Sequence, residues 1–150
     1  MSMSASRETE DELRLGDKKA SMVLTRIAPA IVLVSATGHD KGQFGDAPFV
    51  WLEREMGRHG AIEIFVDMRE MFNATLTVAD GWSAWIKRHR TRIRRMSLLV
   101  SSKYVQMTVE VAKLFSRTGD LMRVYTDAPA FSDAVSQSLG RSFVLGSPRT

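Results

Sequence analysis

The densest charge in this sequence lies in the run Lys-Arg-His-Arg-Thr-Arg-Ile-Arg-Arg, which spans residues 87–95. Six of these nine residues carry a permanent positive charge, and none is acidic. Ammonium and guanidinium groups gathered in this way attract phosphates and carboxylates. The run therefore predicts a surface that binds an anionic partner. We refer to its six cations as the basic surface: Lys87, Arg88, Arg90, Arg92, Arg94 and Arg95.

The basic surface accounts for the positive charge of the whole protein. The 150 residues include 21 basic and 17 acidic side chains, which gives a net charge of +4. Without the basic surface, 15 basic side chains would remain against the 17 acidic ones. An acidic protein, a nucleic acid and an anionic lipid surface each satisfy this electrostatic requirement. We expect an acidic protein partner first, with nucleic acid or anionic lipid as less favoured alternatives, and a homodimer stays open.

A simpler interpretation of the run is structural. Lys and Arg stems cover apolar surface while their charged ends stay in water, so these residues could form only a solvated edge. Trp82 and Trp85 precede the run, and aromatic rings beside cations can stack on the bases of single-stranded nucleic acid. Their spacing relative to Val78 and Ile86 places them on one helical face, which favours packing in the core.

A second group of polar residues lies in and after a glycine-rich segment from 37 to 45. His39, Asp40 and Asp46 could bind zinc or transfer protons if the fold held them within bonding distance. Their spacing matches no metal-ligand pattern, and the glycines lack the Gly-Lys-Ser/Thr ending of a phosphate-binding loop. We therefore predict a solvated loop here, with no metal and no cofactor.

The remaining composition argues against catalysis. The chain contains no cysteine, so thiolate nucleophiles and cysteine-ligated metals are excluded. His59 and His89 have no evident acidic partner for nucleophilic catalysis. We predict that the protein is not an enzyme.

The sequence also bears on location. The first 20 residues mix acidic and basic side chains without an apolar core, so they do not form a secretory signal. The longest apolar run, residues 27–36, contains Pro29 and is far shorter than the ~20 residues that span a bilayer. We expect a cytoplasmic protein without a transmembrane segment.

The elements that must position these residues alternate along the chain. Apolar residues at every second position predict strands, and apolar residues three or four apart predict helices. Two Asp-Ala-Pro sequences, at 46–48 and 127–129, are typical of helix starts. The predicted strands are 11–15, 21–27, 30–36, 61–68, 96–100 and 121–125. The predicted helices are 47–59, 78 to the basic run, 103–117 and 128–139.

This order predicts an α/β fold in a single domain. Its mixed β-sheet would open with antiparallel strands, continue as parallel strand-helix units and be covered by about four helices. Residues 1–19 are expected to form a mobile N-terminal segment or an edge strand. The domain itself is predicted to span residues 20–140, and residues 141–150 to form a C-terminal tail.

Several of these segments resemble the SpoIIAA-like, or STAS-like, domains over about residues 20–140. The resemblance rests on these segments: Val66-Asp67-Met68-Arg69, the helix that carries Trp82 and Trp85, residues 93–100, Phe115 and Val124-Tyr125-Thr126-Asp127. It implies a small bacterial α/β domain, related to anti-sigma factor antagonists that act by docking onto a protein partner. Lipid-carrying SEC14 domains are more distant relatives of the same fold.

The chain departs from this family at one functional motif. Anti-sigma factor antagonists carry an Asp-Ser-x-Gly-type motif with a phosphorylated serine at the start of the second helix, where this chain has Asn73-Ala74-Thr75-Leu76-Thr77. The hydroxyls of Thr75 and Thr77 could accept phosphate in a switch loop, because a dianion is stabilised at a helix N-terminus. Thr77 followed by Asp80 is also typical of a helix cap, and we favour that structural role.

Asp67 and Arg69 lie at the end of a buried strand, where α/β folds often bind ligands. They are candidates for a ligand or loop site, although a local ion pair is the simpler expectation. Together these features predict a non-enzymatic regulatory or protein-interaction domain that docks a partner through its second helix and the basic surface. The alternatives are an apolar small-molecule or lipid-binding domain, and nucleic-acid binding through residues 87–95.

Overall fold

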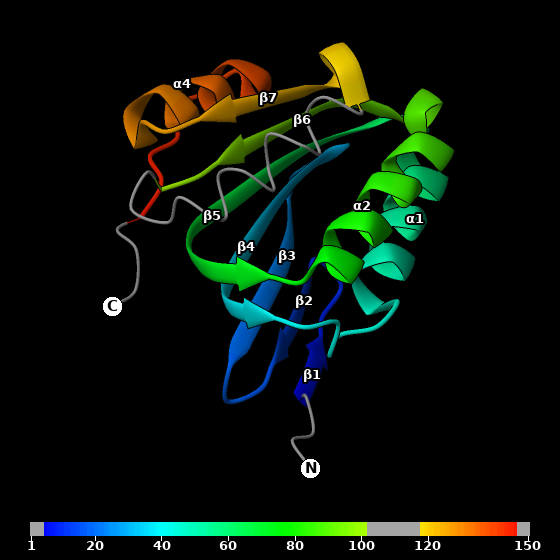
Figure 1. Ribbon diagram of the computed structural model, residues 1–150. Helices are drawn as coiled ribbons and strands as arrows, with labels where there is room; N and C mark the ends of the chain where they lie inside the picture. Colours follow the sequence, from blue (N-terminus) through cyan, green and yellow to red (C-terminus); the bar gives the residue numbers. More distant parts are fainter. Residues whose placement is uncertain (1–4, 102–117, 147–150) are drawn as a thin grey trace.

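The computed structural model describes residues 5–101 and 118–146, which form a layered α/β fold (Figure 1). Within these residues, seven strands build one sheet whose strand order follows the chain. The first four strands pair antiparallel: β1 (Ala5–Glu8), β2 (Glu12–Gly16), β3 (Ala20–Ala28) and β4 (Ile31–Asp40). The strands that continue the sheet in parallel are β5 (Ile62–Ala74), β6 (Ile93–Leu99) and β7 (Met122–Tyr125). The predicted mixed α/β sheet is confirmed.

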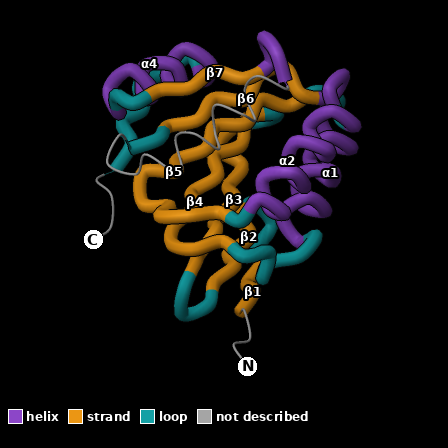
Figure 2. The backbone as a smooth tube through the Cα atoms, in the orientation of Figure 1, coloured by secondary structure: helices purple, strands orange, loops and turns teal. Residues whose placement is uncertain are grey.

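Helices cover both faces of the sheet (Figure 2). α1 (Ala47–His59) and α2 (Leu76–Arg88) lie side by side on one face, and α4 (Ala128–Leu139) lies on the other. Short 3-10 turns, η1 (Arg90–Arg92) and η2 (Gly119–Leu121), precede β6 and β7. The predicted helix at 103–117 lies outside the described residues. No helix in the described parts of the chain has the length and hydrophobicity needed to cross a membrane.

Alternation along β5 explains why the fold has two cores. Ile64 and Val66 point into a larger core beneath α1 and α2, while Phe65 points into a smaller core beneath α4. Phe65 meets Phe131 of α4 edge to face, with ring centroids 5.7 Å apart. The helices contribute these side chains to the larger core: Trp51, Leu52, Met56, Trp85 and Ile86. Since both faces of the sheet are buried here, the first half of β5 is almost entirely apolar.

The segment after α4 closes the smaller core. The hydroxyl of Ser136 accepts a hydrogen bond from the amide of Phe143 at 2.8 Å and donates one to its carbonyl at 3.0 Å. One turn earlier, the hydroxyl of Ser132 accepts a hydrogen bond from the amide of Leu145 at 3.0 Å. These contacts hold residues 141–146 along α4, and both Phe143 and Leu145 pack against the smaller core.

Two strands are longer than the sequence pattern predicts. β4 continues to Asp40 and β5 continues to Ala74. Residues 37–40 of the predicted glycine-rich loop therefore belong to β4, and only residues 41–45 form a loop. The two extensions pair with each other, with Gly38 opposite Met71 and Asp40 opposite Ala74. Polar residues interrupt the apolar alternation in both extensions. The local sequence pattern therefore could not show that the end of β4 pairs with the end of β5.

A buried ion pair joins the sheet to α1. Arg26 of β3 donates from Nε to one carboxylate oxygen of Glu55 at 2.6 Å and from Nη2 to the other at 2.9 Å. The Glu55 side chain is 3% exposed, and the Arg26 side chain is 14% exposed. Hydrogen bonding to this carboxylate raises the pKa of Arg26. At the outer side, Asp11 also accepts a hydrogen bond from Arg26, at 2.8 Å.

Candidate functional site

The basic surface lies where α2 ends and β6 begins. Its first five cations are all exposed to solvent: Lys87 and Arg88 in the last turn of α2, Arg90 and Arg92 in η1, and Arg94 in β6. The C-terminal end of α1 lies at the same end of the molecule (Figure 1). Because the negative ends of both helix dipoles meet here, positive side chains are electrostatically favoured at this position.

A β-bulge separates the sixth cation from the other five. Ile62 of β5 pairs with Ile93 of β6, but the next residue, Glu63, pairs with Arg95. Arg94 is therefore the extra residue of a bulge. Arg95 lies on the same face as Glu63, whose carboxylate accepts a hydrogen bond from a serine of α4 at 2.8 Å. Arg95 is accordingly half-buried on the α4 side, and the five other cations form the open part of the basic surface.

The cations of the basic surface have no partner in the described parts of the chain. Among residues 5–101 and 118–146, none of the six forms a side-chain hydrogen bond or an ion pair. Other arginines in the same residues pair with carboxylates: Arg14, Arg26, Arg54 and Arg69. The fold thus uses the charge of those arginines internally and leaves the charge of the basic surface for solvent or a partner.

The two tryptophans beside the basic surface are used in packing. Trp85 is 3% exposed, stacks on Phe49 with ring centroids 5.3 Å apart, and donates from Nε1 to the Glu53 carboxylate at 3.3 Å. Trp82 is half-buried and meets Phe49 edge to face at 4.6 Å. Glu53 also lies 3.8 Å from Nε2 of His89. These contacts favour the core interpretation of both indoles over base stacking.

The start of α2 differs from the prediction. Thr75, and not Thr77, is the N-cap, because its hydroxyl oxygen accepts a hydrogen bond from the amide of Val78 at 3.3 Å. The helix starts early because β5 continues to Ala74, directly before the cap. The predicted cap at Thr77 is therefore wrong. Thr77 lies exposed in the first turn, and phosphorylation at either threonine stays a prediction.

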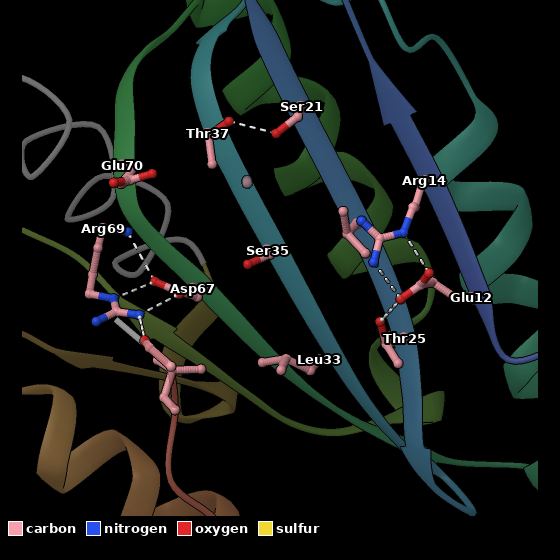
Figure 3. Close-up of a pocket in the computed structure, with 14 residues that line it drawn as sticks. Glu12, Arg14, Ser21, Thr25, Leu33, Ser35, Thr37, Asp67, Arg69 and Glu70 are labelled. Atoms are coloured by element: carbon pink, nitrogen blue, oxygen red, sulfur yellow. Dashed lines mark hydrogen bonds and ion pairs between the residues drawn. The ribbon is translucent and has the colours of Figure 1, made fainter. Parts of the chain in front are cut away.

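Asp67 and Arg69 line a hollow of about 310 Å³ on the α4 side of the sheet (Figure 3). Nε and Nη2 of Arg69 donate to the two carboxylate oxygens of Asp67, each at 2.9 Å. Nη2 also donates to the carbonyl of Gly146 at 2.7 Å. This ion pair therefore ties β5 to the segment that follows α4.

Other polar groups of the same hollow also bind one another (Figure 3). The hydroxyls of Ser21 and Thr37 are 2.6 Å apart, and the hydroxyl of Thr25 donates to the Glu12 carboxylate at 3.2 Å. Arg14 donates to the same carboxylate at 2.7 Å. A ligand here would have to replace existing protein hydrogen bonds, which limits the net gain from binding. The ligand role of the β5 ion pair stays a prediction.

The structure corrects the predicted solvated loop around Asp40. Asp40 ends β4 and is only 5% exposed, whereas His39 and Asp46 are exposed. His39 and Asp40 are successive residues of a strand, so their side chains point to opposite faces. In the described residues, no group of three or more potential metal ligands occurs. Period-two alternation could have located Asp40, because the buried positions before it are Val32, Val34, Ala36 and Gly38.

Asp40 provides a pH-dependent prediction. Burial raises its pKa, and the hydrogen bond from the amide of Gly42 at 2.9 Å opposes this effect only in part. The unfolded chain then deprotonates first, so stability falls as the pH rises from the unfolded pKa through the folded pKa. Asp40→Asn keeps an oxygen for Gly42 and removes the buried charge. We expect this variant to have a higher free energy of unfolding than the wild type at pH 7.

The advantage of Asp40→Asn should shrink as the pH falls through the raised folded pKa of Asp40. It should be lost below about 3.9, the ordinary pKa of an aspartate, because both states of the wild type are then protonated. Urea unfolding at pH 7 and at acidic pH measures the difference. A difference between variant and wild type that is the same at both pH values would contradict the prediction.

Comparisons with known proteins concern the fold. No family model and no curated protein matches this sequence. The structure is similar to that of an uncharacterized protein from the DUF3478 family of Shewanella loihica PV-4, which has a SpoIIAA-like fold. The two are 14% identical with a TM-score of 0.56, over 85% of this chain and 98% of that chain. The mixed sheet with helices on both faces and this likeness together establish that the chain has a SpoIIAA-like fold.

Proposed function

We propose that this domain is a protein-interaction module that binds an acidic partner through the five open cations of the basic surface and the adjoining end of α2. One observation carries the proposal: in the described residues, five exposed cations without an ion pair lie within residues 87–94, and no acidic residue lies among them. Carboxylates of a partner would supply the missing counter-charges. In this proposal the domain acts by docking and catalyses no reaction.

The surroundings of the basic surface favour a protein partner over single-stranded nucleic acid. Binding of unpaired bases relies on exposed aromatic platforms beside the cations. Trp85 is buried, and Trp82 packs against Phe49, so neither indole offers such a platform. The exposed carboxylate of Glu53 next to His89 would also repel a continuous phosphate backbone.

A charge-reversal experiment tests this proposal. The variant Arg92→Glu/Arg94→Glu is expected to recover about tenfold less partner protein than the wild type in affinity capture from a nuclease-treated native lysate. Both side chains are exposed, so we expect the melting temperature to stay near that of the wild type. Arg95→Glu, on the α4 side of the bulge, should have a smaller effect on capture.

The matched control is Arg7→Glu/Arg141→Glu, which changes the net charge equally at two exposed positions outside the basic surface. We expect this control to capture partner protein as the wild type does. Equal capture by both double variants would remove the basic surface from the mechanism. Capture that disappears on nuclease treatment of the wild type would instead support the nucleic-acid alternative.

A further inference from the structure

A small apolar cavity lies between α2 and the ends of the parallel strands. Its volume is about 80 Å³, and side chains from the sheet and from α2 form its wall. Trp82 forms part of the wall on the α2 side. Most of the remaining wall consists of methionine and aliphatic side chains: Met22, Val34, Met68, Met71, Met96 and Leu98. Flexible methionine side chains adapt their shape to an apolar guest.

A second, more polar hollow adjoins this cavity. It has a volume of about 180 Å³ and lies between the N-terminal turns of α1 and α2. Asp40, Val78 and Trp82 line both spaces, so the two spaces meet at these three residues. The described wall of each space contains no Lys, Arg or His, while Asp46 adds a second carboxylate to the outer hollow.

Asp40 is the only ionisable group in the described wall of the inner cavity. It is 5% exposed, and its side chain accepts a hydrogen bond from the Gly42 amide at 2.9 Å. Among the described residues it forms no ion pair, and the nearby Asp17 adds negative charge that raises the pKa of Asp40 further. A buried carboxylate without a counter-ion is unfavourable, and a bound cation would offset that cost.

We propose that the cavity and the adjoining hollow form one binding site for a small organic amine with a short apolar chain. The ammonium group binds the Asp40 carboxylate where the two spaces meet. The apolar chain enters the methionine-lined cavity, and Trp82 lies at the junction of the two spaces. This site lies at the carboxyl ends of the parallel strands and is independent of the basic surface.

Ligand titration followed by NMR tests the site with three probes of equal chain length. These are n-butylammonium, 1-butanol and butyrate, which contain four carbon atoms each and differ in the charge of the head group. n-Butylammonium is expected to give saturable shifts of the Gly42 amide and the Trp82 indole N–H. We expect its affinity to exceed that of 1-butanol about tenfold, since a hydrogen bond to a charged group adds about this factor. Butyrate should not bind.

Two variants assign the effect to Asp40. Asp40→Asn should lower the affinity for n-butylammonium to about that of 1-butanol, while Asp133→Asn should leave it unchanged. Asp133 is a matched control because it is exposed on α4 and lines neither space. A third variant, Ala79→Leu, fills the inner cavity and should lower the affinity for both n-butylammonium and 1-butanol.

The outcomes separate cleanly. Equal affinity of the wild type for n-butylammonium and 1-butanol overturns the proposal, and so does the absence of saturable shifts with n-butylammonium. Retention of full amine affinity by a folded Asp40→Asn variant also overturns it. If Asp40→Asn does not fold, the comparison of the three probes on the wild type decides the question.

Discussion

Gly38→Ala is expected to lower the free energy of unfolding by about 3–5 kcal/mol, through backbone strain and steric overlap. Gly38 has a φ of +84°, which side chains rarely adopt. A Cβ atom at this position would lie 2.0 Å from the carbonyl oxygen of Lys19 and 2.8 Å from Cα of Ala20. Both contacts are backbone atoms at the start of β3, so relief requires separating β3 from β4. Urea unfolding followed by tryptophan fluorescence measures the loss.

The same substitution in α1 is the control. Gly57 is exposed in the last turn of the helix, and a Cβ atom there would have no neighbour within 4 Å. Gly57→Ala should therefore raise the free energy of unfolding by about 0.5–1 kcal/mol, the gain in helix propensity. If Gly38→Ala were as stable as the wild type, this result would contradict the close backbone contact between β3 and β4 at Gly38.

Removing one partner of the buried ion pair should have an effect of similar size. Glu55→Ala leaves the Arg26 guanidinium with exposed partners only, the carboxylate of Asp11 and the backbone carbonyl of Glu10. It is expected to cost about 3–5 kcal/mol of unfolding free energy. Most of this loss is the cost of burying an unpaired charge. Chemical unfolding at neutral pH measures it, and α1 should be the element that loses amide protection from hydrogen exchange first.

Two further variants show whether the loss comes from burial of charge. Glu8→Ala breaks the exposed contact between Glu8 and Arg54 and should cost less than about 1 kcal/mol. Arg26→Met/Glu55→Leu replaces the buried pair with apolar side chains and should recover most of the stability lost in Glu55→Ala. A loss below about 1 kcal/mol for Glu55→Ala would show that the pair does not anchor α1.

The order of strands and helices is predictable from sequence because it depends on local periodicity. Apart from Glu63, the run from Ile62 to Val66 is apolar because both faces of β5 are buried. The apolar stripe of α2 likewise follows from its packing against the sheet. The strand ends depend on pairing between distant residues. Asp40 and Ala74 pair across 34 positions, and nothing close to either residue in the sequence indicates the other.

The candidate sites divide in the same way. The basic surface is visible in the sequence because its six cations lie within nine positions, and the exposure of most of them follows from a helix end and a turn. The separation of Arg95 from Arg94 depends on a bulge, which is defined by the register with β5. The Arg26–Glu55 pair joins residues 29 positions apart, and the amine site needs Asp40 to meet Trp82 across two elements. Such contacts arise only when the sheet and its helices are assembled.

The agreement between strand order and chain order has a consequence for synthesis on the ribosome. Each described strand hydrogen-bonds to the strand translated immediately before it. The antiparallel half, β1 to β4, has all of its internal partners within the first 40 residues, so it can pair while the rest of the protein is still being made. The later strands β5, β6 and β7 then each add to an existing edge, and α1 and α2 cover the sheet as the chain emerges.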